Sequence, residues 1–579
     1  MHMTTVAEQL VRTLQRAGVR RVYGVVGDSL NPIVDAIRRT DGIDWVHVRH
    51  EETAAFAAAA EAQVSGRLAV CAGSCGPGNL HLINGLYDAH RSGAPVLAIA
   101  SHIPSKEIGT GYFQETHPER LFVECSHYCE LISQPEQMPR LLTIAMQTAV
   151  GRGGVAVLAL PGDVAARTAP NAEPAVVPLA QPSPVVPPEH TVAELAGLLD
   201  ASEKVMLFCG AGCRDAHDEV MALAAKLAAP VGHSLGGKEW IQYDNPFDVG
   251  MSGLLGYGAC YDAMQDADRI VLLGTDFPYD DFLPQARTVQ IDIDPARLGR
   301  HTPLDLAVHG DVGATVRALL PRLRERTDRS FLDRMLREHE RGLQRVVDAY
   351  TSKIEHRTPI HPEYAAAILD DVAAEDAIFT VDTGMGNVWA ARYLTPNGRR
   401  RVIGSFRHGS MANALPHAIG AQLAHPDRQV VSISGDGGLS MLMGDLLTVA
   451  LYDLPVKIVV FNNASLGMVK LEMLVDGYPD FGTDHPAVDF SAIAAGCGIP
   501  SVRVEKPTEI RDALTAALGR PGPALIELIT DPNALSIPPK ITAAQVRGFA
   551  LAAGRTVLDG GVGKMIELAR TNLRNIPRP

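Results

Sequence analysis

The sequence predicts an α/β protein with three doubly wound parallel-sheet domains, followed by a C-terminal tail. Short apolar runs with the length of buried strands alternate with segments of helical length, which is the pattern of parallel α/β sheets. A chain of 579 residues is also long enough to form several separate hydrophobic cores.

Two segments of unusual composition divide the chain. Residues 168–190 contain seven prolines and predict an extended linker, whereas residues 326–357 are highly charged with helical spacing and indicate a solvated helix. We therefore predict an N-terminal domain over 1–180, a middle domain over 190–340, a C-terminal domain over 358–535 and a tail over 536–579.

Composition excludes some classes of protein. The formal net charge of -14 argues against a nucleic-acid binder, because phosphate backbones attract excess Lys and Arg. The eight cysteines include no CxxC pair, so we expect reduced structural cysteines in a cytoplasmic protein. The N-terminus resembles an amphipathic helix rather than a signal peptide, and no apolar run has membrane-spanning length.

The most informative pattern is Gly435-Asp436-Gly437, followed after 24 residues by Asn462-Asn463. Residues 429–434 and 456–461 have the apolar character of strands, and residues 439–451 that of a helix between them. In such a unit the two strands are parallel, so Asp436 and Asn463 would lie at the carboxyl edge of the sheet, where ligands bind.

Oxygen ligands at that edge predict a divalent metal site. Mg²⁺ prefers a few protein oxygens together with phosphate and water, and Asp436, Asn463 and the backbone carbonyl of Ser465 would supply them. Gly435, Gly437 and Gly438 would let the backbone approach a phosphate. The alternative is a tight turn after a buried strand, which the combination of both motifs at this spacing disfavours.

Long motifs extend this pattern over nearly the whole chain. Residues 49–63, 71–118, 405–422 and 435–449 resemble the thiamine diphosphate (ThDP) enzymes of the pyruvate oxidase and acetohydroxyacid synthase family. They are most similar to bacterial pyruvate dehydrogenases that pass electrons to quinone. The resemblance implies a pyrimidine-binding first domain, an FAD-binding middle domain and a third domain that binds the diphosphate and Mg²⁺.

The resemblance also assigns the catalytic acid. Glu51 follows a predicted strand at 45–48 and would hydrogen-bond the aminopyrimidine of ThDP, which requires a carboxyl group with a raised pKa. The other interpretation is a helix start, since Glu51 and Glu52 both favour a helix N-terminus. The further ThDP contacts implied are Gly409, Ser410, Met411, Asp436, Gly437, Gly438, Asn463, Ala464, Ser465, Leu466, Gly467, Met468 and Val469.

The substrate pocket is implied by shorter matches. Gly27-Asp28-Ser29, Phe113 and Gln114 would line it from the N-terminal domain, and Glu472 from the C-terminal domain. Met468, which the resemblance places among the catalytic residues, stands where the similar quinone-dependent enzymes carry Phe. Because the family builds its cofactor site between subunits, a homodimer is the minimum expected assembly, and we expect a tetramer.

Glycines and carboxylates at strand ends suggest a flavin site in the middle domain. A GxG alone is usually a strand-to-helix turn, but the resemblance implies FAD contacts at Gly210, Gly212, Gly253, Leu254, Leu255, Gly256, Gly274, Thr275, Asp276, Phe277, Pro278, Tyr279, Asp280, Asp292 and Asp294.

The reaction implied is oxidative decarboxylation of pyruvate to acetate and CO2, with electrons passed through FAD to a membrane quinone. The alternatives are an acetolactate synthase type carboligase, a non-oxidative 2-oxo acid decarboxylase, a pyruvate oxidase that uses O2, or a non-catalytic paralogue.

A quinone acceptor would place the enzyme at the inner face of the cell membrane. In the tail, Val562, Met565, Ile566, Ala569 and Leu573 form one apolar stripe of a helix, which predicts weak binding to lipid. The alternative is that this stripe packs on the protein's own surface.

Overall fold

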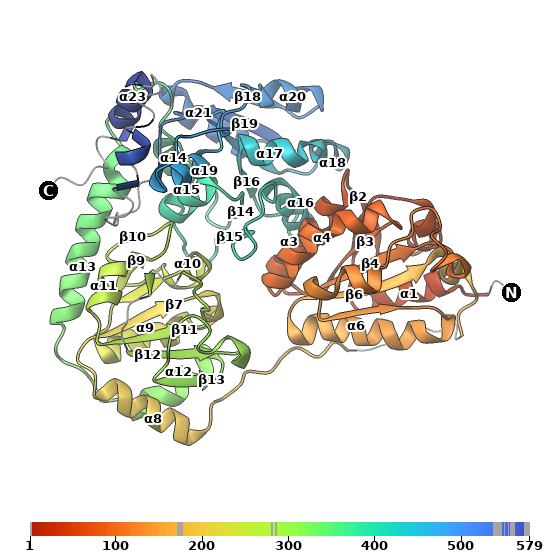
Figure 1. Cartoon of the computed structure of the whole chain (residues 1–579), viewed down its shortest axis with the longest axis horizontal. Helices are drawn as coiled ribbons and strands as arrows, with labels where there is room; N and C mark the ends of the chain where they lie inside the picture. Colours follow the sequence, from red (N-terminus) through yellow and green to blue (C-terminus); the bar gives the residue numbers. More distant parts are fainter. Residues whose placement is uncertain are drawn as a thin grey trace.

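The computed structural model describes residues 3–170, 178–279, 282–283, 287–535, 547–548, 550–553, 555 and 562–572. Within these ranges, the side chains of residues 346, 562–565 and 569 are not described. Three α/β bodies are visible in Figure 1, the first in red to orange, the second in yellow to green and the third in cyan to blue. The predicted fold class is confirmed.

The first body is a parallel sheet with the strand order β2-β1-β3-β4-β6-β5. Strands β3, β4 and β6 are buried along their whole length, as expected where helices cover a parallel sheet, whereas the edge strands β2 and β5 are partly exposed. The strands are β1 (Arg21–Gly24), β2 (Asp44–His47), β3 (Ala69–Gly73), β4 (Val96–His102), β5 (Tyr128–Leu131) and β6 (Val155–Pro161). The helices are α1 (Val6–Arg16), α2 (Asn31–Arg38), α3 (Glu51–Ser65), α4 (Pro77–Arg91), α5 (Pro118–Leu121), α6 (Met138–Arg152) and α7 (Gly162–Ala166).

The third body repeats this topology, with all pairings parallel and the order β15-β14-β16-β17-β19-β18. Its strands are β14 (Ile378–Val381), β15 (Arg401–Gly404), β16 (Val430–Gly435), β17 (Lys457–Asn462), β18 (Ser501–Val504) and β19 (Ala524–Ile529). The helices are α14 (Pro362–Val372), α15 (Met385–Tyr393), α16 (Ala414–Ala424), α17 (Asp436–Leu442), α18 (Leu446–Leu451), α19 (Gly467–Val475), α20 (Phe490–Gly496) and α21 (Ile510–Leu518).

The middle body has the strand order β10-β9-β8-β7-β11-β12-β13, and its pairings are parallel except that of β10 with β9. The strands are β7 (Val205–Cys209), β8 (Val231–His233), β9 (Asp248–Met251), β10 (Tyr257–Gly258), β11 (Arg269–Leu273), β12 (Arg287–Asp292) and β13 (Leu306–His309). The helices are α8 (Glu189–Asp200), α9 (His217–Leu227), α10 (Leu235–Ile241), α11 (Cys260–Asp266), α12 (Val312–Leu319) and α13 (Ser330–Gly342).

Helices α3 and α16 join the first and third bodies (Figure 1). A Cβ atom added to Gly420 of α16 would lie 2.0 Å from the carbonyl oxygen of Ala57 in α3, so the two backbones touch. The alanine-rich sequence of α3 has its physical reason here, because larger side chains would hold α16 away. This packing fixes the N-terminus of α3, and Glu51 with it, beside the third body.

The helix predicted over 439–451 is interrupted. Helix α17 ends at Leu442, a 3-10 turn spans Met443–Asp445, and α18 follows. The cause is a contact between domains, in which Asp445 accepts hydrogen bonds from the Arg49 N–H (2.9 Å) and the Thr53 hydroxyl (2.6 Å).

The described part of the tail contains helix α23 (Val562–Asn572), which packs on the third body. Its buried residue Leu568 joins Leu474, Leu535 and Ala552 in one apolar cluster, and Thr571 donates a 2.9 Å hydrogen bond to Asp531. In the predicted stripe, Ile566 is 60 % exposed, the side chains of Val562, Met565 and Ala569 are not described, and Leu573 lies outside the described residues. Thus α23 docks through Leu568, on the side opposite to Ile566.

Among the described residues, we find no helix with the length and apolar character needed to cross a bilayer.

Candidate functional site

The structure brings Asp436 and Asn463 together at the carboxyl edge of the third sheet. Asp436 begins α17 directly after β16, and Asn463 follows β17, the parallel neighbour of β16. The buried Asp436 carboxylate accepts hydrogen bonds from the backbone N–H groups of Gly437 (2.8 Å), Asn463 (3.1 Å) and Ala464 (2.6 Å). Two strand ends are therefore tied to one carboxylate.

The surroundings of Asp436 fit a small hard cation. The hydroxyl of the buried Ser465 makes no hydrogen bond within the described part of the chain, and the Asn463 side-chain oxygen accepts from the Ser465 N–H (3.0 Å). Burial raises the pKa of Asp436, although His485, 3.7 Å away, opposes the rise. A divalent cation would stabilise the charged carboxylate. His485 lies beyond the motif, and no sequence pattern indicated it.

The predicted pyrimidine loop lies against this turn. A Cβ atom on Gly437 would be 3.5 Å from the terminal methyl group of Met411, so Met411 projects over the predicted diphosphate site. Gly409 has a φ of 77°, and the non-glycine Ala412 has a φ of 68°. A cavity of about 300 Å³ opens here, lined by Glu52, Asn84, Ser410, Met411, Ala412, Met441 and Leu442.

The predicted catalytic acid, Glu51, is surrounded by residues of the first body. Glu51 is the first residue of α3 and is 8 % exposed; its carboxylate lies 2.9 Å from Nδ1 of His81. His50 stacks on His81, and the ligand atoms of His50, Glu51 and His81 lie within 4.8 Å of one another. Glu52, not Glu51, lines the cavity toward the third body of the same chain. No sequence pattern indicated His81 as the neighbour of Glu51.

Two of the predicted substrate-pocket segments meet near Glu51. Ser29 lies 3.0 Å from Ser74, and its hydroxyl accepts from the Cys75 N–H (3.0 Å). Cys75 also contacts the Gln114 side chain (3.4 Å). Phe113 is 79 % exposed in the single chain.

Glycines 210, 212 and 274 pack on one another in the middle body. A Cβ atom on Gly210 would be 2.5 Å from the Gly274 carbonyl oxygen, and one on Gly212 would be 2.6 Å from the Gly274 Cα. The neighbouring backbone alone thus requires glycine at these positions. Flavin contact there stays a prediction, and the predicted contact Asp280 lies outside the described residues.

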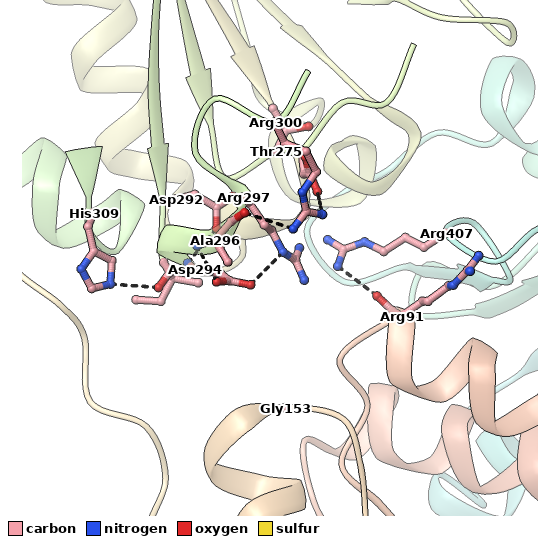
Figure 2. Close-up of polar contacts among 12 residues, drawn as sticks. Arg91, Gly153, Thr275, Asp292, Asp294, Ala296, Arg297, Arg300, His309 and Arg407 are labelled. Atoms are coloured by element: carbon pink, nitrogen blue, oxygen red, sulfur yellow. Dashed lines mark hydrogen bonds and ion pairs between the residues drawn. The ribbon is translucent and has the colours of Figure 1, made fainter. Parts of the chain in front are cut away.

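Polar groups gather at the end of β12, which Figure 2 shows in detail. Asp292 is buried, burial raises the pKa of its carboxyl group, and it accepts from the Asp294 N–H (2.9 Å). Its position is suitable for hydrogen bonds to ribose hydroxyls. Thr275 is buried at the neighbouring strand end.

Three arginines beside Asp292 were not anticipated from the sequence. Arg300 pairs with Asp276 (2.8 Å) and Arg297 with Asp294 (3.2 Å). Arg407 belongs to the third body and donates a 3.2 Å hydrogen bond to the Arg91 carbonyl oxygen at the end of α4 in the first body (Figure 2). It thus links these two bodies at a point beside the middle body. These cations would suit the phosphates of a dinucleotide.

The predicted flavin segments of the middle body contact the third body within one chain. Leu255 of the predicted flavin turn and Met468 of α19 both pack against the same apolar cluster of the third body. Arg392 of α15 donates to the Gly256 carbonyl oxygen (3.2 Å). Burial, and next the charge of Glu472, raise the pKa of Tyr279, so Glu472 lies near the predicted flavin loop.

A candidate metal site at the strand ends of one sheet and a buried acid on a sheet of the same topology fit the class of enzyme that holds a two-ended cofactor between paired domains. The chain belongs to the thiamine pyrophosphate enzyme family: its N-terminal TPP-binding, central and C-terminal TPP-binding domain models match residues 4–121, 192–319 and 382–528.

Relatives over nearly the full length agree. The chain is 35 % identical to a putative thiamine pyrophosphate-containing protein of Bacillus subtilis, over 94 % of this chain and 95 % of the relative. It is 31 % identical to pyruvate oxidase of Lactiplantibacillus plantarum (90 % and 87 %) and 30 % identical to the acetolactate synthase isozyme 1 large subunit of Escherichia coli (91 % and 94 %). These relatives support a ThDP-dependent decarboxylase or carboligase.

Proposed function

We propose that this protein oxidatively decarboxylates pyruvate to acetate and CO2 and transfers the electrons through FAD to a membrane quinone. The observation that carries the oxidative part is the proximity of Tyr279, in the predicted flavin loop, to Glu472 of α19, since burial and next the charge of Glu472 raise the pKa of Tyr279. A flavin on the 274–280 loop would therefore lie beside a residue predicted to line the substrate pocket.

Each residue group has a defined task. ThDP would supply the electron sink for loss of CO2, and FAD would accept two electrons. Asp436, Asn463 and Ser465 would hold Mg²⁺ and the diphosphate, and Met411 would support the bend of the cofactor. Glu51, buried beside His81, would hold a proton at the aminopyrimidine.

The active assembly would be at least a homodimer, and we propose a tetramer. Within one chain, Glu52 and not Glu51 lines the cavity beside Met411, which supports a cofactor held at another subunit's Asp436 as the partner of Glu51. Leu447 and Leu451 of α18 are 49 % and 63 % exposed, as expected for a surface that a second copy covers.

We place the enzyme in the cytoplasm with peripheral contact to the inner face of the membrane. The exposed Ile566 on α23 supports this, because an apolar side chain facing outward can enter the lipid interface.

The test is anaerobic addition of pyruvate to the purified protein with ThDP, Mg²⁺ and FAD. We expect the flavin to be bleached and then reoxidised by a soluble quinone, with acetate and CO2 in equal amounts. Hydrogen peroxide formed in air, at the rate of flavin reoxidation, would instead identify O2 as the acceptor.

The second candidate is acetolactate synthesis, which the similarity to acetolactate synthases favours. Acetolactate accumulating while the flavin stays oxidised would establish it and exclude the oxidative reaction.

A further inference from the structure

A second buried carboxyl group lies at the sheet edge that carries Asp436. Asp382 directly follows β14, which pairs with β16 in parallel. It is 2 % exposed, and its sequence neighbour Thr383 donates a backbone hydrogen bond to Oδ1 (3.1 Å). The same edge therefore presents two acids on adjacent strands.

One oxygen of Asp382 holds the predicted pyrimidine loop. Asn413 donates from its side-chain amide to Asp382 Oδ1 (3.2 Å) and to the Ser410 carbonyl oxygen (2.8 Å). Between them, Ala412 has a φ of 68°, a left-handed conformation that costs a non-glycine residue on the order of 1 kcal/mol or more. The Asp382–Asn413 contact thus helps to keep the loop in a strained shape that places Met411.

The other oxygen faces the predicted diphosphate turn. Asp382 Oδ2 is buried and has no hydrogen-bond partner among the described residues. A Cβ atom on Gly438 would lie only 1.8 Å from it, so only glycine fits beside this oxygen. One carboxyl group therefore touches both segments that are predicted to hold the two ends of ThDP.

The charge of Asp382 can change near neutral pH. Burial raises its pKa to about 7, against the lowering effect of the backbone N–H groups of Thr383, Asn413 and Ala412. An anionic Asp382 close to the diphosphate turn would repel an anionic ligand, whereas the protonated form would not.

We propose that Asp382 is a positioning residue for ThDP, which sets the spacing between the loop 409–413 and the turn 437–438. This inference rests on the assignment of these two segments to the cofactor in the proposed function. It does not depend on whether pyruvate is oxidised.

The test is calorimetric titration of ThDP, with saturating Mg²⁺ and no substrate, into the cofactor-depleted protein between pH 6 and 8. We expect wild-type affinity to fall several-fold as the pH rises through 7. Asp382→Ala should weaken binding by about 10-fold or more, because the loop loses the acceptor oxygen that holds the Asn413 side chain. Asp382→Asn keeps the acceptor oxygen, so it should restore affinity and remove the pH dependence.

The control is Asp445→Asn, which changes another buried carboxyl group of the third body whose pKa burial raises. It should lower thermal stability and leave the pH profile of ThDP binding as in wild type. Wild-type affinity in a folded Asp382→Ala variant would overturn the inference. If that variant does not fold, Asp382→Asn decides, because a wild-type pH profile in this variant would overturn the inference. If these variants alter ThDP binding as expected but pyruvate leaves the flavin of the wild-type protein oxidised, the proposed reaction fails and this inference stands.

Discussion

Asp436 and Asn463, 27 positions apart in sequence, are joined by a 3.1 Å hydrogen bond from the Asn463 backbone N–H to the Asp436 carboxylate. Because the same carboxylate also accepts from Gly437 and Ala464, the turn after each strand is fixed without a cation. A metal arriving there would meet ligands that are already in place, which lowers the entropic cost of binding.

Asp436→Ala should therefore remove Mg²⁺-dependent binding of ThDP. Alanine supplies no oxygen to a cation and leaves the Asn463 and Ala464 N–H groups without their acceptor, so the preformed turn is lost and we expect at least about a 10-fold weaker affinity. Titration of ThDP at several Mg²⁺ concentrations measures this. Asp445→Asn is the matched control, since Asp445 joins two domains rather than lining the predicted metal site. Equal losses in both variants would remove Asp436 from the metal site.

Glu51→Gln should abolish release of CO2 from pyruvate and leave FAD bound. A positioned acid or base contributes about 10²–10⁴-fold to rate, and the amide cannot exchange the proton. Steady-state CO2 release and the flavin absorbance of the purified variant report the two effects.

Glu61→Gln serves as control at the far end of α3, where Glu61 pairs with Arg21 (3.0 Å). If Glu52→Gln, rather than Glu51→Gln, stops CO2 release, the acid is the residue that lines the cavity, and the assignment of Glu51 is wrong.

The sequence predicted the strand ends well for a physical reason. Buried parallel strands are continuous apolar runs, and the residues directly after them are placed by the sheet itself. Asp436 and Asn463 could be located in this way. Asp382 carried the same signal, because it follows the apolar run 378–381, and it could have been found.

Contacts between distant segments left no local pattern. The positions of His81, His485 and Arg407 at the candidate sites depend on segments that are distant in sequence and pack beside them. The break at Met443–Asp445 arises because Asp445 bonds to another domain. Periodicity showed that the tail helix has an apolar stripe, but it could not show that Leu568, on the other side, makes the contact.

Acidification should destabilise the middle body through His233. Burial lowers the pKa of this histidine from 6.5 to about 4. The unfolded chain binds a proton near pH 6.5, whereas the folded one does not until about pH 4. The contribution of His233 to the free energy of unfolding is therefore fully present above pH 6.5. It is lost as the pH falls toward 4, by roughly 3 kcal/mol for a shift of this size.

His233→Asn should reduce the difference between the thermal midpoints at pH 7 and pH 5. Asparagine can keep the contact with the Ser234 carbonyl oxygen (3.1 Å) but does not titrate. The control is His309→Asn, at an exposed strand end, which should show the same difference between the two thermal midpoints as the wild type. An unchanged difference in His233→Asn would mean that another group controls the acid sensitivity.

Docking of α23 should depend on Leu568 and not on Ile566. Leu568 is 5 % exposed and packs on Leu474 of the third body, so Leu568→Ala should cost about 2–5 kcal/mol of docking free energy. Ile566 is 60 % exposed, and Ile566→Ala should change the docking free energy by no more than about 0.5 kcal/mol. Because a helix that opens locally is cleaved in proportion to its open population, limited proteolysis of the folded protein compares the two variants directly. Faster cleavage in Leu568→Ala alone is the expected result, whereas equal rates would show that Leu568 does not hold the tail on the protein.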